Sequence, residues 1–212
     1  MRDAYHEELD AIVRDLAEMT NSVSNAMSSA TTALLDADLQ LAQKVIEEDE
    51  LIDKSYHEIE SRALDLLARQ QPVASDLRII VTSLRMVADI ERAGDLALHV
   101  AKVARRRYPL SSVPPQMRTT ILEMGQIAQL IMTKCGDVIR TQDIALAHEL
   151  EADDDVMDAL HRRIFGQILE QEVGLEVAID ITLIGRYYER FADHAVSIAR
   201  RVVFLVTGER VT

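Results

Sequence analysis

Residues 5–34 read YHEELDAIVRDLAEMTNSVSNAMSSATTAL, and this stretch decides the fold class. Its apolar residues follow one another in steps of three or four, a spacing that places side chains on one face of an α-helix. At 1.5 Å per residue such a helix would extend roughly 45 Å. The pattern therefore predicts a long amphipathic helix with a coiled-coil-like apolar seam. The nine residues of the seam are Tyr5, Leu9, Ile12, Leu16, Met19, Val23, Met27, Ala30 and Leu34.

The rest of the chain predicts five more helices. Asp36 and Asp38 offer side chains that can cap a second helix, and Pro72 ends it because the residue before a proline avoids helical geometry. Gly208 is placed to cap the last helix. The expected ranges are about 38–68, 73–107, 116–140, 144–170 and 172–207.

Three prolines and two serines gather between residues 108 and 116, so this segment is the predicted linker between two halves. The expected domains are a first three-helix repeat at 1–107 and a second at 117–212. Because the connections within each half are short, each half should be an up-down-up bundle. The sequence thus predicts an all-α fold of two tandem three-helix bundles, six long helices in all, of a spectrin-like kind.

The composition argues against several classes of function and location. A net charge of −13 argues against sequence-independent nucleic-acid binding, which requires a basic surface. Cys135 is the single cysteine, so no internal disulfide can form, and a reducing compartment fits. The charged N-terminus does not resemble a signal peptide, and no apolar run reaches the ~18–20 residues that span a bilayer. We therefore expect a cytoplasmic protein.

One acidic motif occurs twice. Glu91-Arg92-Ala93-Gly94-Asp95 and Glu189-Arg190-Phe191-Ala192-Asp193 lie 98 positions apart. Residues four apart share a helix face, so each copy projects two carboxylates together, which disfavours an isolated helix. A hard cation is one way to compensate this repulsion. Neutralisation by arginines on a solvated acidic face is the alternative.

The second helix of each half carries acids at the same spacing, and the blocks 38–53 and 143–158 align at an offset of 105. The acids are Asp49 and Asp53 in the first half and Asp154 and Asp158 in the second. In an antiparallel hairpin they should face Glu91 and Asp95, and Glu189 and Asp193. Four carboxylates at one height repel unless a cation or arginines intervene, and an all-oxygen site suits Mg, Mn, Ca or iron. His57, His161 and His194 could add nitrogen ligands, although each is more simply a surface or packing histidine.

These motifs resemble a known family. Gln71-Pro72-Val73-Ala74-Ser75-Asp76-Leu77-Arg78, followed by Ile90-Glu91-Arg92-Ala93-Gly94-Asp95, is similar to the PhoU family of phosphate-signalling proteins. The second half supplies Glu189-Arg190-Phe191-Ala192-Asp193-His194-Ala195. Together with Tyr187-Tyr188 and Val206-Thr207-Gly208, this run is similar to the actinobacterial branch.

The resemblance implies a PhoU-like fold and a regulator that is not an enzyme. Such a protein represses phosphate uptake and phosphate-starvation signalling through contacts with the ATPase of the phosphate ABC transporter and with a phosphate sensor histidine kinase. It meets the membrane only through these partners, and a homodimer is expected. The resemblance also implies a divalent or ferric ion (Fe, Zn, Mg or Mn) held by Glu91 and Asp95 and by Glu189 and Asp193.

Two other functions stay open from the residues alone. One is a metal-dependent hydrolase or a metal store on a helical bundle, which needs an open coordination position and a nucleophile or base. The chain offers no Ser-His-Asp order, P-loop or Cys-x-x-Cys, and no Glu-x-x-His pair of the di-iron type in these motifs. The other is a helical scaffold whose acids are only solvated.

Overall fold

The computed structural model describes residues 2–70, 72, 74–171 and 173–209. These residues form six α-helices and one short 3-10 helix, which confirms the predicted all-α class. The elements are α1 (Arg2–Asp36), α2 (Leu39–Gln70), α3 (Ala74–Arg107), η1 (Pro115–Met117), α4 (Arg118–Thr141), α5 (Ile144–Glu170) and α6 (Leu175–Thr207). The expected starts of the third and sixth helices, at Val73 and residue 172, lie outside the described residues.

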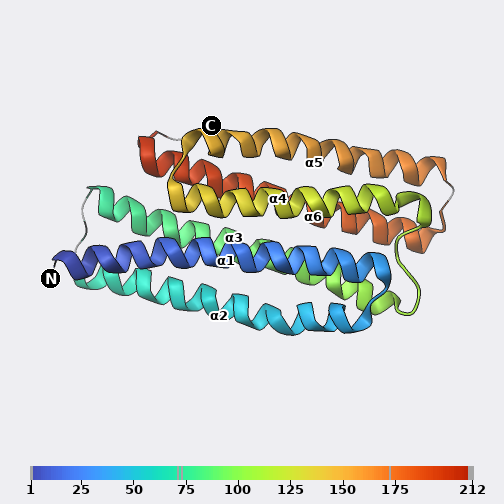
Figure 1. The fold of residues 1–212 in the computed structure, drawn as a ribbon, viewed down its shortest axis with the longest axis horizontal. Helices are drawn as coiled ribbons and strands as arrows, with labels where there is room; N and C mark the ends of the chain where they lie inside the picture. Colours follow the sequence, from blue (N-terminus) through green and yellow to red (C-terminus); the bar gives the residue numbers. More distant parts are fainter. Residues whose placement is uncertain (1, 71, 73, 172, 210–212) are drawn as a thin grey trace.

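All six helices run roughly along the long axis of the molecule (Figure 1). α1, α2 and α3 pack on one another as one bundle, and α4, α5 and α6 pack as a second. The two bundles lie side by side, with α1 against α4 and α3 against α6. α2 and α5 are therefore the outer helices. We call the surface on which α3 and α6 lie between α2 and α5 the α3–α6 face.

The apolar pattern explains the packing. All nine seam residues of α1, from Tyr5 to Leu34, are buried. They belong to one continuous core that extends through both halves.

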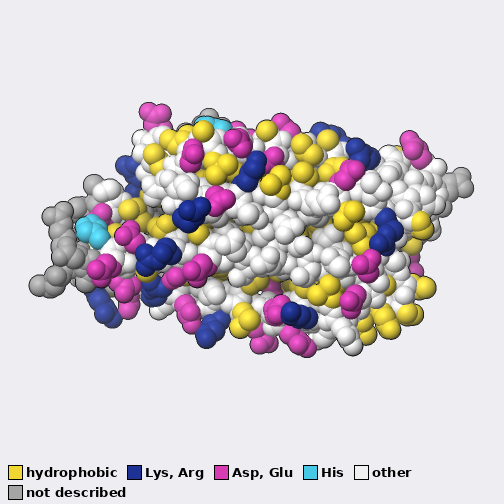
Figure 2. All heavy atoms as spheres, viewed as in Figure 1, with side chains coloured by type: hydrophobic (Ala, Val, Ile, Leu, Met, Phe, Trp, Pro, Cys, Tyr) yellow, Lys and Arg dark blue, Asp and Glu magenta, His cyan; other side chains and the backbone are white. Residues whose placement is uncertain are grey.

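On the opposite side of the molecule from the α3–α6 face, acidic and basic side chains are interspersed over the surface (Figure 2). Whether the halves bounded at 107 and 117 are separate folding domains stays a prediction.

Two glycines of α4 allow α1 to approach closely. A Cβ atom added to Gly125 would lie 2.5 Å from Thr31 Cγ2, and one added to Gly136 would collide with Thr20. Thr31 cannot move aside easily, because its hydroxyl donates to the carbonyl of Met27 and contacts the hydroxyl of Tyr188 at 2.7 Å. The two halves are therefore joined at α1 and α4 by a crossing that side chains larger than hydrogen would obstruct.

The helix ends repeat between the halves. Ala37 and Gln142 both have positive φ, at 50° and 55°, and they are 105 positions apart. The next residue in each half caps the following helix: Asp38 accepts from Leu41 N, and Asp143 accepts from Ala145 N. Gly208, with φ of 77°, caps α6 as predicted. The duplication seen in the acidic blocks therefore extends to the backbone of the turns.

The contacts between α3 and α6 follow the same duplication. Asp89 of α3 meets Ser197 of α6 at 3.3 Å, and His99 of α3 stacks on Tyr187 of α6 at 5.3 Å between ring centres. Adding 98 to 89 gives 187, and adding 98 to 99 gives 197, so each contact joins the two positions that correspond to the other contact. The helices therefore cross antiparallel about an approximate two-fold axis. No helix among the described residues is both long and apolar enough to cross a membrane.

Candidate functional site

The first acid cluster lies between α2 and α3. Asp49 on α2 is half-buried, and burial raises its pKa to about 6, with Asp53 and Asp95 adding to the effect and Lys102 opposing it. The pKa of Glu91 is also raised, first by burial and then by Asp95 and Asp53. The four predicted acids of the first half therefore lie within electrostatic range of one another across the helix pair.

The second acid cluster lies between α5 and α6. Burial raises the pKa of Asp154 to about 6, and Asp193 on the facing helix and Asp158 on its own helix act in the same direction. The pKa of Glu189 is raised by burial and by Asp193, and Arg186 partly opposes this through an ion pair with Glu189. The four predicted acids of the second half are likewise brought together, but two of them already have an arginine partner, because Arg162 lies 3.8 Å from Asp158.

Neither cluster forms a complete metal-ligand set as it stands. Within the part of the chain that the structure describes, no three His, Cys, Asp or Glu side chains converge closely enough to hold a metal ion. The chemistry of the donors nevertheless fits a hard cation, because facing carboxylates with raised pKa are the groups that such an ion stabilises in their charged form. Side-chain rotation about half-exposed carboxylates would be required for binding.

The three histidines named from the sequence lie in different environments. His57 is exposed beside Glu60, 3.9 Å away. His161 packs on Phe165, and burial lowers its pKa. His194 turns away from the second acid cluster towards α3, where its Nδ1 lies 3.4 Å from Asp89.

Two sets of ionic contacts between the halves were not predicted from the sequence. Asp89 of α3 is buried, and it accepts a hydrogen bond from Arg201 of α6 at 2.9 Å. Asp180 of α6 is also buried, and it pairs with Arg106 at 2.6 Å and with Arg107. In the sequence, each of these acids stands alone on an otherwise apolar helix face, which indicates a buried partner. That partner lies more than seventy residues away for both Asp89 and Asp180, so the sequence does not identify it.

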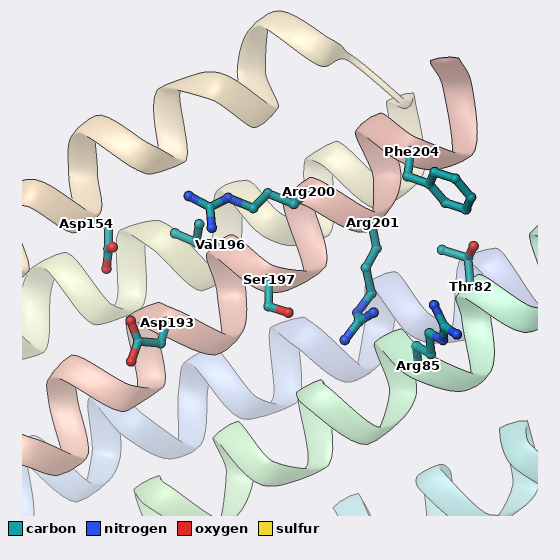
Figure 3. Close-up of a pocket in the computed structure, with 9 residues that line it drawn as sticks. All are labelled: Thr82, Arg85, Asp154, Asp193, Val196, Ser197, Arg200, Arg201 and Phe204. Carbon is teal, nitrogen blue, oxygen red and sulfur yellow. The ribbon is translucent and has the colours of Figure 1, made fainter. Parts of the chain in front are cut away.

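A cavity of about 410 Å³ opens on the α3–α6 face beside the second acid cluster. Figure 3 shows its lining, with Asp154 and Asp193 at one end, Arg85 of α3 and Arg201 of α6 at the other, and Arg200 extending towards Asp154. The lining residues are Thr82, Arg85, Asp154, Asp193, Val196, Ser197, Arg200, Arg201 and Phe204. The cavity was not predicted, because it forms only where α3 of the first half meets α5 and α6 of the second.

Comparison with known proteins gives two kinds of match to the sequence. A protein-family model for the PhoU domain matches residues 16–104 and again residues 121–202. The phosphate-specific transport system accessory protein PhoU homolog 2 of Mycobacterium tuberculosis is 47% identical over 210 residues, which cover 98% of this chain and 99% of the relative. PhoU homolog 1 of Mycobacterium leprae is 46% identical over 210 residues, which cover 98% of this chain and 95% of the relative.

Solved structures match the fold over its full length. The crystal structure of PhoU from Pseudomonas aeruginosa superimposes with a TM-score of 0.85 at 29% sequence identity, covering 99% of this chain and 100% of that one. The phosphate transport system regulatory protein PhoU from Streptococcus pneumoniae gives a TM-score of 0.85 at 25% identity, covering 98% and 99%. The side-by-side arrangement of two three-helix bundles is therefore shared with both.

Proposed function

Because the chain belongs to the PhoU family, we propose that it regulates phosphate-specific transport and restrains phosphate uptake and phosphate-starvation signalling when phosphate is plentiful. Its relatives are named accessory proteins of the phosphate-specific transport system, which supports the first part of this proposal. The second part, restraint of phosphate-starvation signalling, rests on the resemblance of the two acidic motifs to those of the PhoU family.

The observation that carries the proposed mechanism is the presence of one acid cluster per repeat, each between an outer helix and a helix of the α3–α6 face. An acid cluster with raised pKa is a repelling, variable surface in the absence of a cation. A divalent or ferric ion (Fe, Zn, Mg or Mn) would convert it into a surface of fixed charge and geometry. We propose that Glu91 and Asp95, with Asp49 and Asp53 beside them, bind such an ion in the first repeat.

In the second repeat the corresponding acids are Glu189, Asp193, Asp154 and Asp158. The ion pair between Arg186 and Glu189 competes with a metal there, so weaker occupancy is proposed for this cluster. The metal-bound surface would contact the ATPase of the phosphate transporter and the phosphate sensor kinase in the cytoplasm. Assembly as a homodimer belongs to the same proposal.

The proposal requires no turnover by the protein itself. The alternative, a metal-dependent hydrolase or a metal store, makes a different prediction. A phosphatase assay over several metals would favour it if activity appeared and was lost in the Asp95→Ala variant.

The test of the regulatory role is a reporter of phosphate-starvation transcription in a strain whose own copy is replaced. The Glu91→Ala/Asp95→Ala variant should derepress the reporter in phosphate-rich medium. The matched control is Glu7→Ala/Asp10→Ala, which removes two exposed acids from α1 and should leave repression intact. Full repression by the first variant, at normal protein level, would reject a role for these acids.

Metal binding is tested separately on purified protein. Elemental analysis of protein prepared without chelator should find a transition metal or magnesium that is lost when Glu91, Asp95, Glu189 and Asp193 are all replaced by alanine. Equal metal content in both proteins would show that these acids are only solvated.

A further inference from the structure

The cavity on the α3–α6 face carries an inference that goes beyond the proposed regulatory role. We infer that it is a binding site for a small phosphate-bearing anion, whose phosphoryl group is held by Arg85 and Arg201.

Two arginines of α6 line the cavity, and each keeps terminal amino groups that its carboxylate partner does not use. Arg200 donates through Nε to Glu151 at 2.9 Å, and Arg201 donates through Nε to Asp89 at 2.9 Å. Each carboxylate thus fixes one guanidinium through a single nitrogen and leaves its terminal amino groups available. A planar guanidinium that is already oriented loses less entropy when it binds a phosphoryl oxygen.

Arg85 supplies a positive charge that no described carboxylate neutralises. It is exposed on α3, and it forms no ion pair with any residue that the structure describes. Arg85 and Arg201 extend into the same space from opposite helices, with the hydroxyl of Ser197 nearby (Figure 3). The Ser197 hydroxyl already donates to Asp89. Two cations from different helices therefore provide the converging contacts for one tetrahedral anion.

The corresponding place in the other half is built differently. With the offset of 98, Arg85 corresponds to Leu183, Arg201 to Val103 and Thr82 to Asp180. Asp180 places a carboxylate there, and Arg106 and Arg107 already neutralise it. Asp180 therefore supplies an internal anion at that place. In the cavity, Thr82 stands where Asp180 would be. Glu151 and Asp89 pair with Arg200 and Arg201, and no described carboxylate pairs with Arg85. This difference between duplicated positions favours an external anion beside Arg85.

The size of the cavity indicates a ligand larger than a water-sized ion. Its volume of about 410 Å³ equals roughly fourteen water molecules at ~30 Å³ each. It also lies within the range of ~300–1,000 Å³ that is usual for small-molecule sites. Val196 and Phe204 add apolar wall. The phosphoryl group can belong to free inorganic phosphate or to a nucleotide, and the volume and the apolar wall favour the nucleotide.

Asp154 and Asp193 at the far end set a limit on the pose. An anion beside them would be repelled, so the phosphoryl group should lie at the arginine end, away from the second acid cluster. Binding is therefore expected without added metal.

The experiment is isothermal titration of the purified full-length chain with inorganic phosphate, ATP and sulfate, each with and without magnesium. Wild-type protein should bind at least one phosphate-bearing anion in the chelated buffer, and more tightly than sulfate. The Arg85→Gln variant should lose on the order of tenfold in affinity, consistent with removal of one charge-assisted contact. Circular dichroism would verify that this exposed substitution leaves the fold intact.

The matched control is Arg14→Gln, which removes one exposed arginine from α1 and should leave the affinity unchanged. Equal binding of phosphate and ATP would identify free phosphate as sufficient, whereas binding of ATP alone would identify an ester; both support the site. The inference is overturned if neither anion binds at millimolar concentration, or if both arginine variants lose affinity equally. Binding that needs magnesium and ignores Arg85→Gln would also overturn it. None of these outcomes depends on the reporter used for the regulatory role.

Discussion

Asp89 of α3 and Arg201 of α6 form an ion pair of 2.9 Å that joins the two halves of the molecule. Burial alone would raise the pKa of Asp89, but hydrogen bonds from His194 and Arg201 outweigh it and lower the pKa below its usual value. The carboxylate is thus held charged inside the junction by groups from the other repeat.

Replacing Asp89 by alanine should lower the free energy of unfolding by about 2 kcal/mol, because Arg201 and His194 lose their shared acceptor. Arg201 is 30% exposed and can reach water, so the loss should be smaller than for a fully buried pair. Urea denaturation measures the effect. Asp10→Ala, at an exposed site on α1, is the control and should change stability by less than about 0.5 kcal/mol.

The lowered pKa of Asp89 also predicts how the stability of the protein changes at low pH. A folded-state pKa below the unfolded value of about 3.9 gives stability that is present above pH ~4 and lost as the pH falls through the lower folded value. The Asp89→Asn variant should therefore approach wild type in stability as the solution is acidified. A difference between the two proteins that stayed constant to pH 2 would contradict this linkage.

Asp49 and Asp154 predict the opposite pH dependence. Their folded-state pKa of about 6 lies above the unfolded value, so the native protein binds more protons than the unfolded chain between pH ~4 and ~6. Metal-free protein should lose stability as the pH rises through this window. The double variant Asp49→Asn/Asp154→Asn should lose this slope and melt on the order of 2–4 °C higher than wild type at pH 7. Calorimetry in chelated buffer tests it, and identical slopes would contradict it.

Gly125 should not tolerate a methyl group. Gly125→Ala places Cβ against the hydrogen-bonded side chain of Thr31 and should cost about 1–3 kcal/mol through overpacking. Gly166→Ala in α5 is a matched control, because a Cβ there meets nothing within 4 Å. That control should stabilise the protein by about 0.5–1 kcal/mol, since alanine favours helix more than glycine does. Chemical denaturation of both variants would measure the two changes in the free energy of unfolding, which should be opposite in sign.

Cys135 should be unreactive in the native protein. It is fully buried, and burial raises the pKa of its thiol, so the reactive thiolate is not formed at neutral pH. A chromogenic disulfide reagent should label it only as the chain unfolds, with a rate that follows the denaturant dependence of unfolding. Rapid labelling in native buffer would contradict the packing of α4 against α6.

Local pattern was enough to predict much of this structure. The seam of α1, the stop before Pro72, the cap at Asp38 and the cap at Gly208 each depend on neighbours within one or two helical turns. The mutual approach of the acids on paired helices also followed, because hairpin partners are adjacent in sequence. Their role as metal ligands stays a prediction.

Contacts between distant helices could not be predicted in the same way. Nothing near Arg106 and Arg107 in the sequence indicates their partner, and the structure gives them Asp180 of α6. His194 was considered as a ligand beside Asp193, but helix rotation turns it towards Asp89. Which helices cross, and in which direction, depends on the whole core rather than on any single segment.

The approximate two-fold axis between α3 and α6 has a consequence for how this protein can diversify. In a true homodimer every substitution appears twice, so a side chain near the axis must be compatible with its own copy. Joining both halves in one polypeptide removes that restriction. Asp89 and Tyr187, or Arg85 and Leu183, occupy matching places with unrelated chemistry. A single gene thus keeps the architecture of a symmetric pair while each half acquires its own specialisation.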